Sequence, residues 1–240
     1  MIAVKIENVK KSYKDTKALK GVSAEIKPGE LYGLLGLNGA GKTTLISIIA
    51  GLTKADDGDI TVGGKSVKTE SDEVKKIIAV SPQETAVAPN LTVKENLEFF
   101  AELYGKHKNG ATVAMEEFGL TGVADKRAKN LSGGYARRLS VAAAVITEPE
   151  LLILDEPTLG LDVIARRELW KLIKARKGKT TIILTTHYLE EVEALCDRIC
   201  LLKEGEKIFE GTVEEMKTLA GQDNFEDAFV KISQGEICRE

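Results

Sequence analysis

Cysteine and histidine are scarce in this chain, since its 240 residues include three cysteines and two histidines. A small, odd number of thiols argues against a disulfide framework, and so few nitrogen and sulfur ligands argue against a zinc site. Long apolar runs are also missing, because the run at 141–146 is far shorter than the about 20 residues of a membrane-spanning helix. Residues 1–14 contain no long apolar core before a cleavage site, so we expect no secretion signal there.

An excess of basic residues is missing as well. Lysine and arginine total 34 against 37 aspartates and glutamates, which gives a formal net charge of −3. Nucleic-acid-binding proteins are usually basic, so no nucleic acid is expected as a partner. Any anionic ligand must therefore be held by a local group of donors. With 43% hydrophobic residues, the chain is long enough to bury a sizeable core, as one large domain or as a domain with a lobe.

The apolar pattern alternates between strands and helices, which predicts an α/β fold. The runs "IAVKIENV" and "ALKGVSAEI" are typical of an antiparallel β edge, and the pair Gly63-Gly64 between two β-prone runs predicts a hairpin. The nearly continuous apolar run "LYGLLG" is typical of a strand buried on both faces of a mostly parallel sheet. Further strands of this sheet are expected at 77–81, 151–157 and 180–187.

The stretch from about 84 to 149 changes character and predicts an inserted helical lobe. Thr92 and Glu95 fit a capping box and Gly105 supplies a stop, so a helix is expected between them. Two more helices are expected, in "TVAMEEFGL" and after Ser132. The predicted boundaries are a core at about 1–83 and 150–211, the lobe at about 84–149, and a helical tail at about 212–240 that begins with a capping box at Thr212.

The segment "GLNGAGKTT" fits the phosphate-loop pattern and lies between a buried strand and a helix, as that motif requires. Its glycines let backbone N–H groups converge on an anion, and the dipole of the following helix adds favourable charge. Lys42 would reach the outer phosphates of a nucleotide, and the Thr43 hydroxyl would coordinate Mg²⁺. The expected nucleotide-binding residues of this loop are Gly36, Leu37, Asn38, Gly39, Ala40, Gly41, Lys42, Thr43 and Thr44.

Two carboxylates follow the buried run at 151–154. Asp155 and Glu156 emerge at the carboxyl end of that strand, where ligands lie in open parallel sheets. Asp155 would hold Mg²⁺ through its water shell, and Glu156 would polarise a water for attack on the γ-phosphate. His187 ends another buried strand at the same edge and would contact the γ-phosphate. Gln83, just past "IIAVS", can touch Mg²⁺ or the attacking water.

A second glycine-rich helix start has no lysine. In "NLSGGYARRLSVAAAVI", residues 130–146, a serine and two glycines precede an amphipathic run, as at an anion-binding helix N-terminus. The chain already contains a complete phosphate loop, so the anion that this second turn would serve has to be found elsewhere.

Taken together, these segments resemble the nucleotide-binding subunit of ABC transporters over essentially the whole chain. The phosphate loop, the glutamine after "AVSP", "LSGG" at 131–134, "LLILDEP" at 151–157, "GLD" at 160–162 and "TTH" at 185–187 occur in that family's order and approximate spacing. The resemblance implies a phosphate-loop NTPase core, ATP and Mg²⁺ as cofactors, and ATP hydrolysis.

The resemblance also implies a use for the second turn. In this family two nucleotide-binding domains face head to tail, and each ATP lies between the phosphate loop of one chain and "LSGG" of the other. Ser132, Gly133 and Gly134 would complete the γ-phosphate cage of a partner that supplies its own lysine. Asp162 joins the site through the "GLD" motif. Tyr13 matches the aromatic that stacks on adenine, and an ordinary edge-strand tyrosine is the alternative.

One departure from the family pattern lies next to this turn, where Tyr135 replaces the usual glutamine. The preceding serine and glycines make the phosphate contacts, so we expect altered interface detail with activity retained. A second departure is the loop "TLGLD", in which many members have alanine before "LD".

The resemblance implies partners and a location. The partners are a second copy or a homologous ATP-binding subunit, and a transmembrane permease subunit that docks through the helical lobe near Gln83. The chain would then be cytoplasmic and peripheral on the inner face of the cell membrane. The segment 81–105 and the late "NFEDAFVKIS" are similar to subunits of multidrug, antibiotic or sodium exporters, so export is expected.

Two other functions are compatible with the same motifs. A soluble relative could serve an assembly scaffold or act as a translation factor, although translation-type members carry two sets of motifs and this chain has one. A degenerate nucleotide-binding regulator is the third reading, and the intact Glu156 and His187 oppose it.

Overall fold

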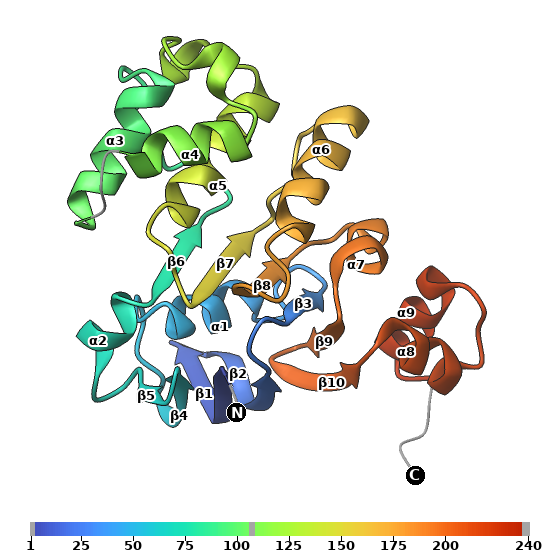
Figure 1. Ribbon diagram of the computed structural model, residues 1–240. Coiled ribbons are helices and arrows are strands. Elements are labelled where there is room, and N and C mark those ends of the chain that lie inside the picture. The colour runs from blue at the N-terminus through green and yellow to red at the C-terminus, as the bar shows by residue number, and fades with distance from the viewer. Residues whose placement is uncertain (1–2, 106–108, 237–240) are drawn as a thin grey trace.

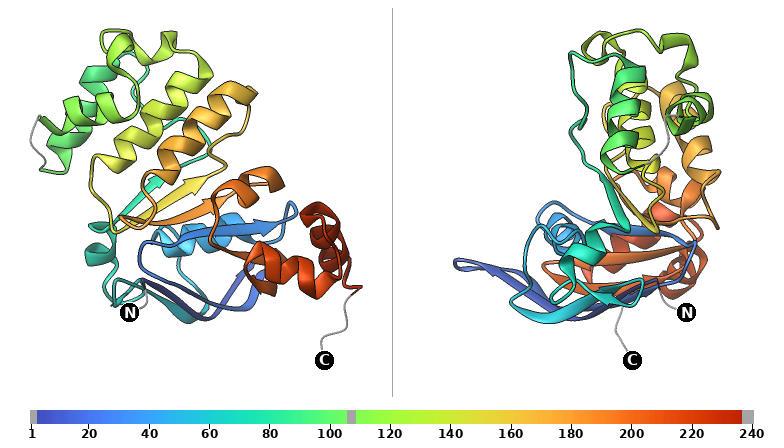
Figure 2. Two further views of the ribbon diagram at one scale, coloured as in Figure 1. Left: turned by 45° about the vertical axis from the view of Figure 1, so that its right-hand side comes forward. Right: turned by 60° about the vertical axis from the view of Figure 1, so that its left-hand side comes forward.

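The computed structural model describes residues 3–105 and 109–236, which form two sheets and a helical lobe (Figures 1 and 2). The larger sheet contains, in spatial order, β10 (Glu206–Gly211), β9 (Arg198–Lys203), β3 (Leu31–Gly36), β8 (Thr181–Thr185), β7 (Leu151–Asp155) and β6 (Ile78–Ser81). The strands from β9 to β6 are parallel, and β10 pairs antiparallel with β9. The mostly parallel sheet expected from the apolar runs is therefore confirmed.

The smaller sheet is antiparallel throughout and forms the expected β edge. Its spatial order is β2 (Thr16–Ile26), β1 (Val4–Tyr13), β4 (Asp57–Val62) and β5 (Lys65–Ser66). The Gly63-Gly64 hairpin between β4 and β5 is confirmed, and both glycines have the positive φ that such a turn needs. The helix α1 (Lys42–Ile49) packs into one hydrophobic cluster with strands of both sheets, so it is the layer between them.

The strands of the larger sheet are apolar on both faces because both faces are covered. All six residues of β3 are buried. In β7, Ile153 packs in the cluster that contains α1, whereas Leu152 and Leu154 pack in the cluster of the helical lobe. Alternate side chains of one strand thus enter two different layers. The carboxyl ends of β3, β6, β7 and β8 then lie at one edge of the sheet, where the predicted site residues follow them.

The helical lobe contains α3 (Val93–Leu103), α4 (Asn109–Glu117) and α5 (Gly133–Val145), and α6 (Val163–Lys174) lies beside α5 (Figure 1). The capping box that begins α3 is confirmed, because the Thr92 hydroxyl accepts from the Glu95 N–H at 3.1 Å and the Glu95 carboxylate accepts from the Thr92 N–H at 2.7 Å. The helix expected after Ser132 is also confirmed, with Ser132 at its N-cap.

The tail differs from the single helix expected from Thr212. It forms two helices, α8 (Val213–Ala220) and α9 (Phe225–Gln234), which pack against each other and near α7 (Leu189–Leu195). Gly221 has a φ of 61° and ends α8, and the Asn224 side chain then caps α9. A short helix, α2 (Ser71–Lys75), was not predicted either. The last four residues of the predicted tail lie outside the described residues.

Among the helices of residues 3–105 and 109–236, none combines the length and apolarity needed to cross a bilayer.

Candidate functional site

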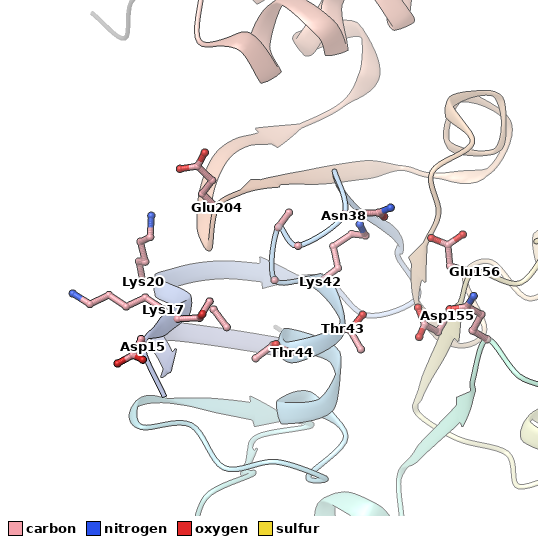
Figure 3. Close-up of a pocket in the computed structure, with 16 residues that line it drawn as sticks. Asp15, Lys17, Lys20, Asn38, Lys42, Thr43, Thr44, Asp155, Glu156 and Glu204 are labelled. Atoms are coloured by element: carbon pink, nitrogen blue, oxygen red, sulfur yellow. The ribbon is translucent and has the colours of Figure 1, made fainter. Parts of the chain in front are cut away.

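A cavity of about 720 Å³ opens at the carboxyl edge of the larger sheet, where β3 leads into α1 (Figure 3). Figure 3 shows Lys42 and Thr43 on the side that faces Asp155 and Glu156. The structure therefore brings the two halves of the predicted site together from segments more than a hundred residues apart in the sequence. The lining residues are Asp15, Thr16, Lys17, Ala18, Lys20, Asn38, Gly39, Ala40, Gly41, Lys42, Thr43, Thr44, Gln83, Asp155, Glu156 and Glu204.

The phosphate loop takes a path that two of its glycines make possible. Gly36 has a φ of 148°, and a Cβ built on it would lie 2.4 Å from the Leu202 carbonyl oxygen. Gly41 has a φ of 104°, and its Cβ would lie 2.6 Å from the Ala18 carbonyl oxygen. Gly41 is the N-cap of α1, so no side chain occupies the N–H groups of the first helical turn, and that turn contains no acidic residue. The exposed helix start is available to an anion.

Lys42 folds back over this loop. Its Nζ donates to the Gly36 carbonyl at 2.6 Å and lies 3.3 Å from the Leu37 carbonyl oxygen. Burial lowers the pKa of Lys42, and the nearby carboxylates of Glu156 and Asp155 oppose that shift. The ammonium group is thus held over the loop by backbone carbonyls of the loop itself.

Thr185 fixes the two acidic residues relative to each other. Its hydroxyl donates to Asp155 Oδ1 at 2.5 Å and accepts from the Glu156 N–H at 3.0 Å. Thr185 is fully buried at the end of β8, and β8 pairs with β7 at Asp155. The sequence motif "TTH" pointed to His187 alone, and the positioning role of Thr185 was missed.

Glu156 and His187 form a direct pair. His187 Nδ1 lies 2.5 Å from Glu156 Oε2, as expected from two residues that leave neighbouring strands at one edge. Glu156 also has a φ of 48°, the left-handed conformation that non-glycine residues rarely adopt. The buried Thr185 contacts hold this turn. The left-handed turn at Glu156 directs its carboxylate away from β7 and toward the edge of the cavity.

A second hollow, of about 490 Å³, lies beside the first and shares residues with it. Asn38, Gln83 and Glu156 line both, and His187 lines only the second. Gln83 therefore borders both hollows, as Asn38 and Glu156 do. Thr43, Gln83 and Asp155 offer one hydroxyl, one amide and one carboxylate to the same cavity.

These oxygen donors suit a hard cation that keeps other ligands. Within the part of the chain that the structure describes, no group of three or more histidine, cysteine, aspartate or glutamate side chains is arranged to hold a metal by itself. Mg²⁺ is typically held by one or two protein oxygens together with water and substrate phosphates, and the donor set here fits that pattern.

The second glycine-rich turn lies outside both hollows. Ser132 and Gly133 are exposed at the start of α5, and the Ser132 side chain makes no capping hydrogen bond. A Cβ on Gly134 would lie 3.0 Å from the Cβ of Ala165 on α6, so the helix start is packed closely against its neighbour. Within one chain the structure does not bring Ser132, Gly133 and Gly134 to the phosphate loop.

The structure also shows the contacts of Tyr135 and Asp162. Tyr135 packs against the lobe, and the guanidinium of Arg138 lies 4.4 Å from its ring centroid. Asp162 caps α6, since its carboxylate accepts from the N–H groups of Ile164 and Ala165 at 2.9 Å each, and it does not line either hollow.

Tyr13 ends β1 with about half of its surface exposed, and Lys11 Nζ lies 5.4 Å from its ring centroid. Tyr13 does not line the cavity, although Asp15 of the next turn and Lys17 and Lys20 of β2 do. Sequence reasoning missed those rim residues, because nothing local marks them. They are Asp15, Lys17, Lys20 and, from the turn between β9 and β10, Glu204.

Comparisons with known proteins agree with this geometry. The sequence model of the ABC transporter family matches residues 19–159. The chain is 44% identical over 222 residues to the linearmycin resistance ATP-binding protein LnrL of Bacillus subtilis (strain 168), and the match covers 90% of this chain and 71% of that protein. It is 42% identical over 214 residues to the Nod factor export ATP-binding protein I of Burkholderia orbicola (strain AU 1054), covering 87% of this chain and 70% of that protein.

A solved structure with the same fold is described as a dimeric, post-hydrolysis state of an ATP-binding cassette bound to ADP and Pi. It is 30% identical to this chain, has a TM-score of 0.77, and is matched over 87% of this chain and 98% of that chain. The fold, the order of motifs and the relatives agree with each other.

Proposed function

This chain belongs to the ABC transporter family as an ATP-binding, ATP-hydrolysing subunit, and on that premise we propose that it powers export through a separate transmembrane permease. The observation that supports the site assignment is the convergence of the Lys42 loop and the Glu156–His187 pair on one hollow edge of the sheet. Export as the direction rests on the relatives, one of which is a Nod factor export ATP-binding protein.

We assign the binding of the nucleotide to the loop from Gly36 to Thr44. The N–H groups at the start of α1 would donate to the phosphates, and Lys42 would exchange its contacts with the Gly36 and Leu37 carbonyls for phosphate oxygens. Tyr13 would contribute a face for the adenine ring from the strand that leads to the cavity rim.

Mg²⁺ would be held by Thr43 and Gln83, with Asp155 acting through water. When bound, it would neutralise charge on the phosphate oxygens. The hydrogen bond from Thr185 keeps the Asp155 carboxylate in place for this task.

Glu156 is assigned as the general base. Its carboxylate would accept a proton from the attacking water, and His187 would orient that carboxylate through Nδ1 and contact the γ-phosphate. Both ring nitrogens must carry a proton if His187 is to donate to Glu156 through Nδ1 and to a γ-phosphate oxygen through Nε2 at the same time, because both of these oxygens act as acceptors.

We propose that each complete site is shared by two chains. Ser132 and Gly133 are exposed, and the turn that they form with Gly134 has no lysine and lies away from the phosphate loop of its own chain. A helix start of this kind can bind a phosphate by hydrogen bonds and dipole alone, so it can close the site of a second copy or a homologous subunit. The anion that the turn at Ser132–Gly134 would bind is therefore the γ-phosphate of the ATP held by the partner.

Metal dependence tests the assigned chemistry. We expect EDTA to reduce ATP hydrolysis by the purified chain to the background without enzyme, and excess Mg²⁺ to restore it, as followed by phosphate release. Hydrolysis that continues at the same rate in EDTA would contradict the roles of Thr43 and Asp155.

The permease would dock on a groove between the lobe and the core. This groove has a volume of about 380 Å³, and Leu52, Phe100 and Tyr104 contribute apolar surface to it. Leu52 is 74% exposed and Tyr104 is 49% exposed, so the groove offers neighbouring apolar side chains to a partner. The groove also includes Ala86, three residues after Gln83, so a protein bound there would touch the segment that enters the site. This arrangement would place the chain on the cytoplasmic face of the membrane.

Leu52→Glu is expected to abolish recovery of the membrane partner with the tagged chain from detergent-solubilised membranes of its own cell, while ATP hydrolysis by the isolated chain is unchanged. The change puts a charge into an apolar contact and touches no site residue. Leu219→Glu is the matched control, because Leu219 is 53% exposed on α8, far from the groove. Capture of only non-membrane proteins by the parent chain would favour the assembly-scaffold alternative.

A further inference from the structure

Arg137 lies in the second turn of α5 and is 5% exposed. Its guanidinium donates to four backbone carbonyls. Nε donates to Pro157 at 2.7 Å, Nη2 donates to Asp155 at 2.8 Å, and Nη1 donates to Pro82 at 2.5 Å and to Gln83 at 3.3 Å. The side chain of Arg137, from the helical lobe, therefore holds two loops of the core by hydrogen bonds.

These carbonyls lie where the sheet stops. The ladder between β6 and β7 ends at the pair Ser81–Leu154. Proline follows at 82 and at 157, and proline has no N–H to donate to a neighbouring strand. The planar guanidinium of Arg137 joins the segments that follow β6 and β7, where backbone hydrogen bonds between the two strands have ended.

The Arg137 charge has no carboxylate among these four acceptors, and its burial is costly. Desolvation lowers the pKa of Arg137 to about 10, with the field of Asp155, Glu191 and Glu156 opposing that shift. The group remains protonated at neutral pH, so all its donors stay available. Because a buried cation that binds only backbone carbonyls is costly, this arrangement indicates that the positions of those carbonyls matter to the protein.

The gripped loops carry the chemistry of the site. Gln83 is itself one of the two residues that Arg137 contacts in the first loop, and Glu156 lies between Asp155 and Pro157, the two that it contacts in the second. Arg137 itself is five residues after Ser132, which is about 7.5 Å along a helix that rises about 1.5 Å per residue. The position of α5 and the positions of Gln83 and Glu156 are thus set through one guanidinium.

We propose that Arg137 is a positioning residue that holds Gln83 and Glu156 of one nucleotide site in register with the helix start, Ser132–Gly134, that the same chain offers to the other site. This inference rests on the proposed shared sites. It predicts that loss of the Arg137 hydrogen bonds impairs both ATP hydrolysis and ATP-dependent dimerisation, while ATP still binds to the phosphate loop.

The test compares Arg137→Met, Arg137→Lys and Arg138→Met. Methionine keeps apolar bulk without donors, and lysine keeps the charge and up to three donors. Arg138 is the matched control on the same helix, because it stacks on Tyr135 and pairs with Glu168 at 3.6 Å without touching either loop. For each variant, kcat, KM for ATP, the affinity for a fluorescent ATP analogue and the thermal midpoint are measured.

Arg137→Met should lower kcat by about tenfold or more, since small misplacements of reacting groups cost that much, with analogue affinity within about twofold of the parent. Arg137→Lys should recover part of the lost kcat, and Arg138→Met should match the parent. In a background that also carries Glu156→Gln, Arg137→Met should weaken ATP-dependent dimerisation by about tenfold in sedimentation.

Parent-like kcat and dimerisation of Arg137→Met would overturn the inference and reduce Arg137 to a space-filling role, because methionine keeps apolar bulk and donates no hydrogen bond. A loss of analogue affinity parallel to the loss of kcat would also overturn it, because that result indicates general misfolding. If the parent hydrolyses no ATP, or if Glu156→Gln alone does not dimerise with ATP, it is the proposed function that fails.

Discussion

Replacing Glu156 with glutamine is expected to stop ATP turnover while ATP remains bound. The amide keeps the shape of the carboxylate and can still meet His187 Nδ1, which lies 2.5 Å from Glu156 Oε2, but it cannot take a proton from water. General-base catalysis contributes about 100-fold to 10,000-fold to such reactions, so kcat should fall by at least about 100-fold. Steady-state phosphate release measures the loss, and a fluorescent ATP analogue measures the retained binding.

The second part of this result is accumulation of a trapped state. If hydrolysis opens the dimer, a chain that binds ATP without cleaving it should accumulate as an ATP-containing dimer in gel filtration. Glu204→Gln is a matched control, because Glu204 lines the same cavity and has a φ of 49°, nearly the same as the 48° of Glu156. We expect its kcat to stay within about twofold of the parent. A Glu156→Gln variant that hydrolyses ATP within a few-fold of the parent would show that Glu156 is not the base.

Local chemistry explains which parts of the fold were predictable. The starts of α3 and α8 were correct because a capping box is written in four consecutive residues, Thr92 to Glu95 and Thr212 to Glu215. The division of the tail was missed, although Gly221 and Asn224 carry a stop and a cap signal. Two such signals three residues apart mark a tight helix–helix corner only when something packs on both helices, and here that is β9 and α7, contributed by distant sequence.

The site shows the same division between local and distant information. Lys42, Asp155 and Glu156 were predictable because each motif needs its residue types at fixed spacing beside a buried strand. Thr185 and Arg137 were missed because their partners are 30 and 55 residues away, as in the contacts Thr185–Asp155 and Arg137–Pro82. Their function comes from the carboxyl ends of neighbouring strands meeting at one edge, which depends on strand order.

The two glycine-rich turns differ in a way that explains the missing lysine. The start of α1 is concave, lines a cavity and carries Lys42, so it can hold most of a nucleotide. The start of α5 is exposed at Ser132 and Gly133 and packs at Gly134 against α6. It offers backbone donors on an exposed surface. Such a surface is suited to cover a phosphate that another chain has already bound.

Mixing two inactive variants is expected to restore ATP hydrolysis. Lys42→Ala removes the charge at the phosphate loop and leaves the face at Ser132–Gly134 intact. Ser132→Arg blocks that face with a bulky side chain and leaves the chain's own phosphate loop intact. Each homodimer then has two damaged sites and should be nearly inactive. In a head-to-tail heterodimer both lesions fall in one site, and the other site is native.

The size of the rescue follows from pairing statistics. In an equal mixture that pairs at random, half of the dimers are heterodimers with one native site of two, so about a quarter of the parent's activity should return. The rate should rise more steeply than linearly with total protein, and the parent must first show that dependence. A mixture of Ser132→Arg with a chain carrying both changes is the control, because none of its dimers contains a native site and none should hydrolyse ATP.

Absence of rescue in a mixture whose heterodimers are demonstrated would contradict independent shared sites, and the retained nucleotide then identifies the reason. With Glu156→Gln added to both chains, a heterodimer with one native site should hold one ATP per dimer after gel filtration. Retention of that single ATP without hydrolysis in the Glu156 background would mean that the two sites work only together. If no ATP is retained, the turn at Ser132–Gly134 does not close the partner's site, and its exposed helix start has another use.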